Sequence, residues 1–127
     1  MDPPAPSSPR VAAECAVVAL GAVAGATARW GAGELVAARP SGFPLATVLV
    51  NVAGCLLAGF AAARLRRGSL GWLCLVTGAL GGFTTFSTFA VDTRLLLGDR
   101  WPVALACIAA SLGGGVAATS VARRAAA

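Results

Sequence analysis

The sequence predicts an all-α membrane protein with four transmembrane helices. Of its 127 residues, 57% are hydrophobic and 12% are charged, whereas a soluble domain carries about 25% charged residues. With a mean hydropathy of +0.81, the chain cannot cover a core with polar surface, so lipid is the expected solvent. The apolar runs are continuous rather than alternating, which excludes a transmembrane β-barrel. At about 20 residues per span, the length accommodates four spans but not five.

The first ten residues, MDPPAPSSPR, are typical of a disordered tail, because they contain four prolines and two serines. Prolines come first and a span-length apolar stretch follows, which does not match a cleaved signal peptide. We therefore expect a Pro/Ser-rich tail over residues 1–10, a four-helix transmembrane domain over residues 11–124 and a short C-terminal tail over residues 125–127. Within the domain, the spans are expected at about residues 11–36, 43–63, 70–91 and 101–121.

The third span is expected to be a broken helix. Its centre reads GALGGFTTFSTF, and Gly, Thr and Ser all disfavour an uninterrupted helix. A break at membrane depth is tolerated only where the freed backbone groups are buried in protein or line a cavity. Freed carbonyls can bind a cation, and a helix N-terminus can bind an anion. The alternative is a kinked helix that serves packing alone.

The net charge of +5 comes from ten arginines and five acidic residues, without histidine. Their scatter at span ends argues against a nucleic-acid partner. With four spans, both termini share one side of the membrane. That side holds Arg10, Arg64, Arg66, Arg67, Arg123 and Arg124, and the other holds Arg39, Arg94 and Arg100. This moderate excess favours termini inside but leaves insertion in both orientations open.

Polar side chains inside a span are candidates for function, since they are costly in lipid. Asn51, near the middle of the second span, either donates to an anion or bridges to another helix. Arg29, near the end of the first span, either snorkels to the interface or is neutralised by carbonyls of a neighbouring helix. Phe86 and Phe89 share one helix face; their positive ring edges suit an anion beside a narrow path, although lipid or core contact is the common role of such rings.

Small residues recur at fourfold spacing and indicate close helix packing. They are Gly21 and Gly25 in the first span, Gly78 and Gly82 in the third, and Ser111, Gly115 and Thr119 in the fourth. One cysteine falls in each apolar segment, namely Cys15, Cys55, Cys74 and Cys107. We interpret these four as packing residues.

Three motifs together resemble the Fluc (CrcB) fluoride channel family: GAVAGATARW in the first span, FPLATVLVNVAG in the second and GALGGFTTFSTF in the third. The resemblance covers about residues 17–119. It implies passive export of cytoplasmic fluoride by a multi-pass protein of the cell membrane, which is not an enzyme. It also implies an antiparallel (dual-topology) homodimer with a structural Na⁺ at its centre.

Carried over by position, the resemblance assigns the fluoride pore to Asn51, Phe86, Phe89, Ser87, Thr88, Ser111 and Arg29. The backbone carbonyls of Gly81 and Thr84 are assigned to Na⁺. Cys107 departs from the family pattern, which has Tyr at this position. The departure leaves open that the partner in the dimer is a related, non-identical subunit.

Two other functions remain open at this stage. A small multidrug-resistance-type exporter couples transport to protons through a membrane-embedded carboxylate, for which Glu14 is the candidate, although it lies too near the start of its span. A non-transporting membrane assembly subunit would use the glycine stripes and Asn51 for packing alone.

Overall fold

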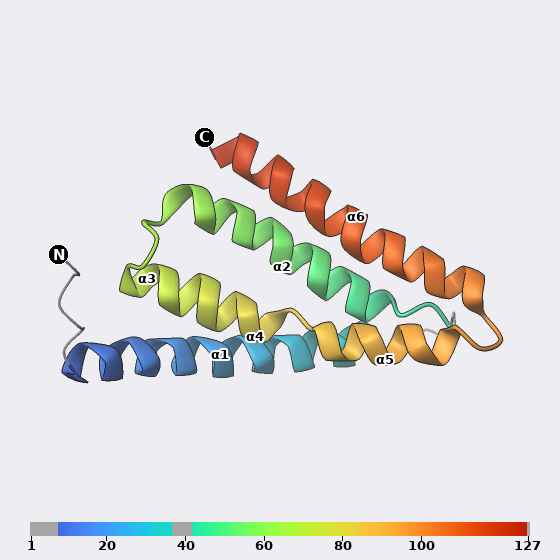
Figure 1. The fold of residues 1–127 in the computed structure, drawn as a ribbon, viewed down its shortest axis with the longest axis horizontal. Coiled ribbons are helices and arrows are strands. Elements are labelled where there is room, and N and C mark those ends of the chain that lie inside the picture. Colours follow the sequence, from blue (N-terminus) through green and yellow to red (C-terminus); the bar gives the residue numbers. More distant parts are fainter. Residues whose placement is uncertain (1–7, 37–41, 127) are drawn as a thin grey trace, which may run out of the picture.

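The computed structural model describes residues 8–36 and 42–126, which form helices joined by short loops (Figure 1). Four helical segments in this part of the chain are long and apolar enough to cross a membrane: Pro9–Val36, Leu45–Arg64, Leu70–Leu96 and Trp101–Ala126. The predicted all-α, four-span architecture is therefore confirmed.

The first, second and fourth spans are single helices: α1 (Ser8–Val36), α2 (Leu45–Arg64) and α6 (Trp101–Ala126). The third span is a succession of elements, with α3 (Leu70–Trp72), the π-helical η1 (Leu73–Leu80), α4 (Gly81–Phe83) and α5 (Phe86–Leu96). The third span lies along α1, and α2 lies between the third span and α6 (Figure 1).

The helices extend beyond the expected spans at several ends. α1 begins at Ser8, so residues 8–10 of the expected tail are helical, while residues 1–7 lie outside the described part of the chain. α6 continues to Ala126, because alanine is the best helix former and arginines near a helix C-terminus interact favourably with its dipole. Residue 127 is also outside the described residues.

Glycines bring α1 against the third span. A Cβ atom added at Gly21 would overlap the carbonyl oxygen of Cys74, and one at Gly25 would overlap that of Ala79. From the other side, a Cβ at Gly82 would lie 2.5 Å from the carbonyl oxygen of Ala22. The backbones approach so closely that no side chain fits between them, and the predicted packing role of these glycines is confirmed.

Small residues also join α2 to α6. A Cβ at Gly59 would lie 2.8 Å from the carbonyl oxygen of Thr119. The Thr119 hydroxyl donates to the carbonyl of Cys55 over 3.2 Å. This contact places the middle of α2 beside the face of α6 that carries Ser111 and Gly115.

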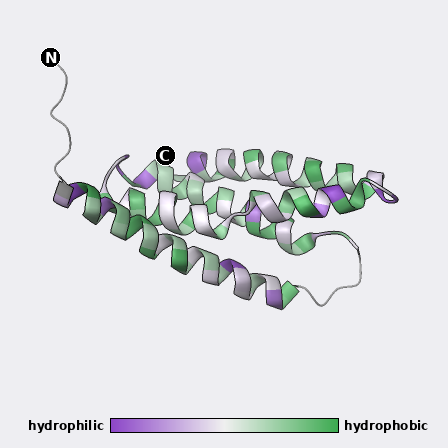
Figure 2. Ribbon diagram, turned by 60° about the horizontal axis from the view of Figure 1, so that its bottom comes forward, coloured by the Kyte–Doolittle hydropathy of each residue, from purple (hydrophilic) through white to green (hydrophobic). Residues whose placement is uncertain are grey.

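The outer surface of the helices suits lipid or another apolar partner. Figure 2 shows hydrophobic residues along all the long helices, with hydrophilic ones mainly near their ends. Large apolar side chains stand exposed on α1, including Leu20 and Trp30, and on α6, including Leu112 and Val116. Burial inside the chain therefore accounts for only part of the hydrophobicity of each span.

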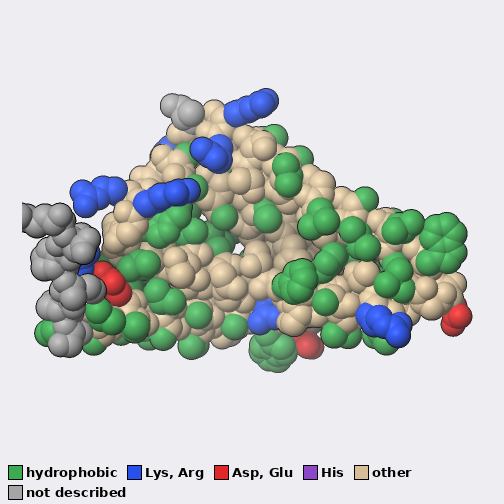
Figure 3. Space-filling view, in the orientation of Figure 1, with side chains coloured by type: hydrophobic (Ala, Val, Ile, Leu, Met, Phe, Trp, Pro, Cys, Tyr) green, Lys and Arg blue, Asp and Glu red, His purple; other side chains and the backbone are tan. Residues whose placement is uncertain are grey.

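The start of α1, the α2–α3 loop and the end of α6 lie at one end of the bundle (Figure 1). Arginine side chains gather at this end (Figure 3), where Arg64 donates from Nε to the carbonyl of Ala126 over 3.2 Å. The Arg67 guanidinium lies 5.6 Å from the centre of the Trp72 ring, a pairing suited to a membrane interface. Arg39, expected at the opposite end, lies outside the described residues.

Candidate functional site

The site is built on two extended residues between α4 and α5. Thr84 has φ −73° and ψ 157°, and Thr85 has φ −141° and ψ 121°. The Thr84 amide and hydroxyl each donate to the carbonyl of Leu80 over 3.0 Å, which closes the last turn of α4. The Thr85 hydroxyl accepts from the backbone N–H of Thr88 over 3.1 Å and so caps the start of α5. Threonine hydroxyls thus satisfy helix ends within the span.

Asn51 of α2 binds the backbone of Thr85 with both ends of its amide. Its Nδ2 donates to the Thr85 carbonyl over 2.9 Å, and the Thr85 N–H donates to its Oδ1 over 2.8 Å. Without Asn51, the backbone N–H and carbonyl of Thr85 would lose these bonds inside the membrane, where water cannot replace them. The structure therefore shows the bridging role of Asn51. Because a carboxamide carries two N–H donors, one N–H of Asn51 remains for a ligand.

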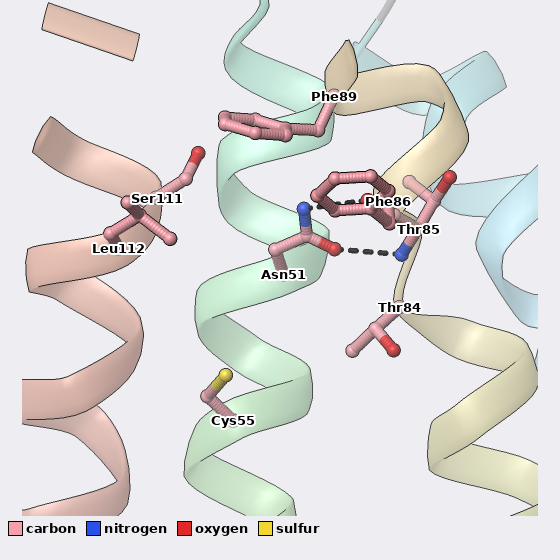
Figure 4. Close-up of a pocket in the computed structure, with 8 residues that line it drawn as sticks. All are labelled: Asn51, Cys55, Thr84, Thr85, Phe86, Phe89, Ser111 and Leu112. Atoms are coloured by element: carbon pink, nitrogen blue, oxygen red, sulfur yellow. Dashed lines mark hydrogen bonds between the residues drawn. The ribbon is translucent and has the colours of Figure 1, made fainter. Parts of the chain in front are cut away.

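A cavity of about 260 Å³ opens beside this pair (Figure 4). Its lining residues are Asn51, Cys55, Thr84, Thr85, Phe86, Phe89, Ser111 and Leu112. They come from α2, the interruption, α5 and α6, and none of them is charged. An uncharged cavity with a few convergent polar groups has the chemistry of a small-ligand or ion pathway.

The two phenyl rings lie beside the Asn51 amide (Figure 4). Their centroids are 5.9 Å apart and their planes are inclined by 44°. Phe89 is half-buried, whereas Phe86 is 79% exposed although it lines the cavity. The wall of the cavity at Phe86 is therefore open within one chain.

Ser111 reaches the cavity from α6, opposite Asn51 (Figure 4). The residue is only 9% exposed, and its hydroxyl has no hydrogen-bond partner among the described residues. A buried hydroxyl without a partner costs about 1–3 kcal/mol. This hydroxyl is thus available to a ligand in the cavity.

A second cavity of about 190 Å³ shares Thr85 with the first and is also lined by Arg29, Thr47 and Thr88. The Arg29 Nε donates to the carbonyl of Gly82 over 3.1 Å. This bond agrees with the interpretation in which Arg29 meets carbonyls of a neighbouring helix rather than snorkelling to the interface. Arg29 does not line the first cavity.

The structure thus separates the residues that were assigned to one pore. Asn51, Phe86, Phe89 and Ser111 line the first cavity, and Arg29 and Thr88 line the second. Ser87 lines neither; it is exposed, with its hydroxyl 3.3 Å from that of Thr85. Thr84 lines the first cavity and Gly81 lies one turn before the interruption.

Sequence reasoning missed three features of this region. Thr85 was read only as part of the break, yet it is buried and joins both cavities. The Thr47 hydroxyl donates to the Asp92 carboxylate over 2.6 Å and ties α2 to α5. Cys55 was read as packing but lines the first cavity; its position four residues after Asn51, on the same helix face, is the signal that could have found it.

Two further candidates are not in the cavities. Cys107 is fully buried and lines none of the cavities described. Glu14 forms an ion pair with Arg10 one turn away on α1, with 2.9 Å between Nε and Oε1. A paired carboxylate near the start of the first span is a poor proton carrier for the exporter hypothesis. Within residues 8–36 and 42–126, no group of three or more His, Cys, Asp and Glu side chains could hold a metal ion.

Comparisons with known proteins place the chain in a family. Residues 16–123 match the family described as "CrcB-like protein, Camphor Resistance (CrcB)". The chain is 52% identical over 113 residues to fluoride-specific ion channel FluC 2 of Symbiobacterium thermophilum, covering 84% of this chain and 92% of that protein. It is 50% identical over 91 residues to fluoride-specific ion channel FluC of Paracoccus denitrificans, covering 70% and 73%. It is 39% identical over 110 residues to fluoride-specific ion channel FluC of Chloroflexus aurantiacus, covering 82% and 87%. The chain therefore belongs to the CrcB family.

Proposed function

We propose that this multi-pass membrane protein is a fluoride-selective channel through which cytoplasmic fluoride leaves the cell passively across the cell membrane. Relatives that align over most of this chain bear the name fluoride-specific ion channel. The observation that best supports the proposal is the uncharged cavity in which Asn51, Ser111 and two phenyl rings surround one space. The activity is conduction down a gradient and not catalysis.

The cavity offers what a small anion needs when it leaves water. Fluoride is strongly hydrated, so its water must be replaced by donors at close range. The spare N–H of Asn51 and the unpartnered Ser111 hydroxyl are such donors. The ring edges of Phe86 and Phe89 add positive potential without a formal charge. A neutral set binds the anion strongly enough for entry and weakly enough for release.

Arg29 stays outside the first cavity in this proposal and acts on the interruption through its contact with Gly82. Its guanidinium is bonded to the Gly82 carbonyl, and Arg29 lines the second cavity, which shares Thr85 with the first. Glu34 also lines the second cavity, so the guanidinium and this carboxylate together set its charge. Thr88 lines the same second cavity, and Ser87 and Thr88 both bond to the Thr85 hydroxyl. In this proposal Ser87 and Thr88 stabilise the interruption of the third span, which is a broken helix.

The functional unit in this proposal is an antiparallel dimer. Phe86 is 79% exposed and the cavity is open at that wall, so a second copy would supply the missing side. The start of α1 and the end of α6 share one end of the bundle (Figure 1), and dual topology would place the two arginine-rich ends on opposite sides of the membrane. A paired related subunit could fill the same role. Flux from liposomes that hold this chain alone distinguishes the two.

We also propose a structural Na⁺ bound by the backbone carbonyls of Gly81 and Thr84. The residues fit such an ion because the extended conformation of Thr84 turns its carbonyl out of the hydrogen-bonding pattern of α4. Backbone carbonyls are hard oxygen ligands, suited to a hard cation. A second copy of the chain would supply its own Gly81 and Thr84 carbonyls to the same ion. The ion would join the interruptions of two chains and neutralise their carbonyl dipoles.

The test is fluoride efflux from liposomes, measured with a fluoride electrode. The purified chain should release fluoride while retaining chloride. Asn51→Ala removes a donor and frees the Thr85 backbone, and Phe86→Ile removes a ring edge, so both should lower the flux by at least about tenfold. Undiminished flux in both variants would defeat the pore assignment.

Glu14→Gln serves as the matched control, because the proposed channel uses no proton-coupled carboxylate. It should leave fluoride flux within about twofold of the unchanged chain, since an exposed ion pair contributes about 0–1 kcal/mol. An exporter predicts loss of proton-coupled transport in this variant, and an assembly subunit predicts no flux from any of these proteins.

A further inference from the structure

We propose that Cys55 is a site for soft, thiol-seeking ligands of the class of methylmercury, and that a ligand bound there obstructs the first cavity. Binding of such a ligand to the Cys55 sulfur does not depend on the proposed function, whereas the block of fluoride flux rests on it.

Cys55 lies where two cavities meet. It lines the first cavity with Asn51 and also lines an adjoining cavity of about 370 Å³ along α6. Both cavities are further shared by Ser111 and Leu112. Figure 4 shows the thiol one turn from Asn51 on the same side of α2. A group attached to this sulfur therefore stands in the space between Asn51 and Ser111.

Gly115 and Thr119 of α6 hold the sulfur in place. Gly115 faces Cys55 across the helix contact, where a Cβ would lie 3.1 Å from the Cys55 Sγ. The Thr119 hydroxyl bonds the Cys55 carbonyl and keeps this turn of α2 against α6. Gly115 and Thr119 are four residues apart on one face of α6. They form a notch for the thiol without adding bulk.

A second observation points to a ligand at this place. The Ser111 hydroxyl lines both cavities that Cys55 lines, is more than nine-tenths buried and has no hydrogen-bond partner among the described residues. Thiolate is the preferred protein ligand for soft metals.

The other cysteines differ in position. Cys15 is exposed, Cys74 is half-buried and Cys107 is fully buried. None of the three lines any of the cavities described. These thiols are natural controls, because a ligand on them would not stand between Asn51 and Ser111.

The chemistry is a ligand exchange without a change of oxidation state. The Cys55 thiol loses its proton to water, and its sulfur forms a bond to mercury as chloride leaves methylmercury chloride. One proton and one chloride are released for each S–Hg bond formed. An excess of a small thiol reverses the exchange and restores the free cysteine.

The experiment uses the full chain in liposomes with methylmercury chloride, a neutral reagent that enters membranes. Peptide mass spectrometry should find one methylmercury group on Cys55. Fluoride efflux should fall at least about tenfold and recover after dithiothreitol. Cys15→Ser should show the same block, whereas Cys55→Ser and Cys55→Ala should show the same flux with and without the reagent, each compared with its own untreated rate.

Several outcomes would overturn the proposal. They are a persistent block in both Cys55 variants, an adduct on Cys55 with undiminished flux, or adducts on other cysteines while Cys55 stays free. If the untreated chain conducts no fluoride, the proposed function fails, and the mass-spectrometric result alone decides whether Cys55 is the ligand site.

Discussion

At the scale of single residues, several polar groups inside the spans are paired with each other across helices. The side-chain carbonyl and one side-chain N–H of Asn51 bond the backbone of Thr85, and the second N–H makes neither of these bonds. Thr47 and Asp92 pair with each other. The hydroxyls of Ser111 and Thr93 are buried and have no hydrogen-bond partner within residues 8–36 and 42–126. Substitution of a paired group should therefore lower the stability of the protein, whereas substitution of Ser111 should lower its fluoride flux.

Ser111→Ala separates a structural from a conducting role. Because the hydroxyl has no partner, its removal should leave thermal stability in detergent unchanged or slightly raised. Fluoride flux should fall about tenfold, as expected for a lost donor of about 1.4 kcal/mol. Ser120→Ala is the control, since the Ser120 hydroxyl bonds only its own helix at Val116. A loss of stability with unchanged flux would assign Ser111 to packing.

Thr47→Val tests the contact between α2 and α5. The substitution keeps the shape of the side chain but leaves the Asp92 carboxylate without its 2.6 Å donor. We expect destabilisation by about 2 kcal/mol, measured by thermal unfolding in detergent. Thr27→Val is the matched control, because the exposed Thr27 hydroxyl bonds the carbonyl of Val23 one turn earlier on α1. Equal stability of the two variants would show that the Thr47 contact contributes nothing.

At the scale of elements, close packing through glycine positions the site. α1 holds η1 and α4 at backbone contact, and α4 ends at Phe83, directly before the interruption. Asn51 then bonds the interruption to α2. The position of Thr84 and Thr85 therefore depends on a contact made by a different helix.

Gly25→Ala should disrupt this arrangement. The new Cβ would overlap the Ala79 carbonyl oxygen, and overpacking of this kind costs about 1–3 kcal/mol. Gly31→Ala lies in the same helix with nothing within 4 Å of the added Cβ. It should instead stabilise α1 by up to about 1 kcal/mol through helix propensity. Thermal unfolding of both variants measures the difference, and a stable Gly25→Ala protein would refute the tight contact.

At the scale of the whole molecule, charge is distributed unevenly between the two ends of the bundle. Arginines gather at the end that carries the start of α1 and the end of α6 (Figure 3). Arg94 lies in the last turn of α5, at the other end. Orientation in a membrane follows such differences in short flanking segments. Because the difference in positive charge between the two ends is moderate, removal of a few arginines should change the membrane orientation of the protein.

The proposed dual topology can be tested with this sensitivity. Arg123→Gln combined with Arg124→Gln lowers the charge at the C-terminal end and should move the C-terminus outward in a larger fraction of molecules. Arg94→Gln removes a charge at the opposite end and should shift the distribution the other way. Protease accessibility of a C-terminal tag in sealed vesicles measures both. A distribution that neither change alters would contradict dual insertion.

Local sequence determined the helical class, the four spans and the glycine contacts. These features depend on hydropathy over about 20 residues and on spacing along one helix, which the chain itself displays. The three motifs also resemble those of one family, and the match over residues 16–123 confirms that resemblance. The expected fluoride selectivity, dimer and Na⁺ remain predictions for the experiments above.

Only the tertiary structure decided which partner each polar group meets. Asn51 and Thr85 are 34 positions apart, and Arg29 and Gly82 are 53 apart. Such pairs depend on the relative rotation and axial shift of two helices, which no short pattern encodes. The same freedom explains why Cys55, one of four similar cysteines by sequence, lines the cavity while Cys107 is buried away from it.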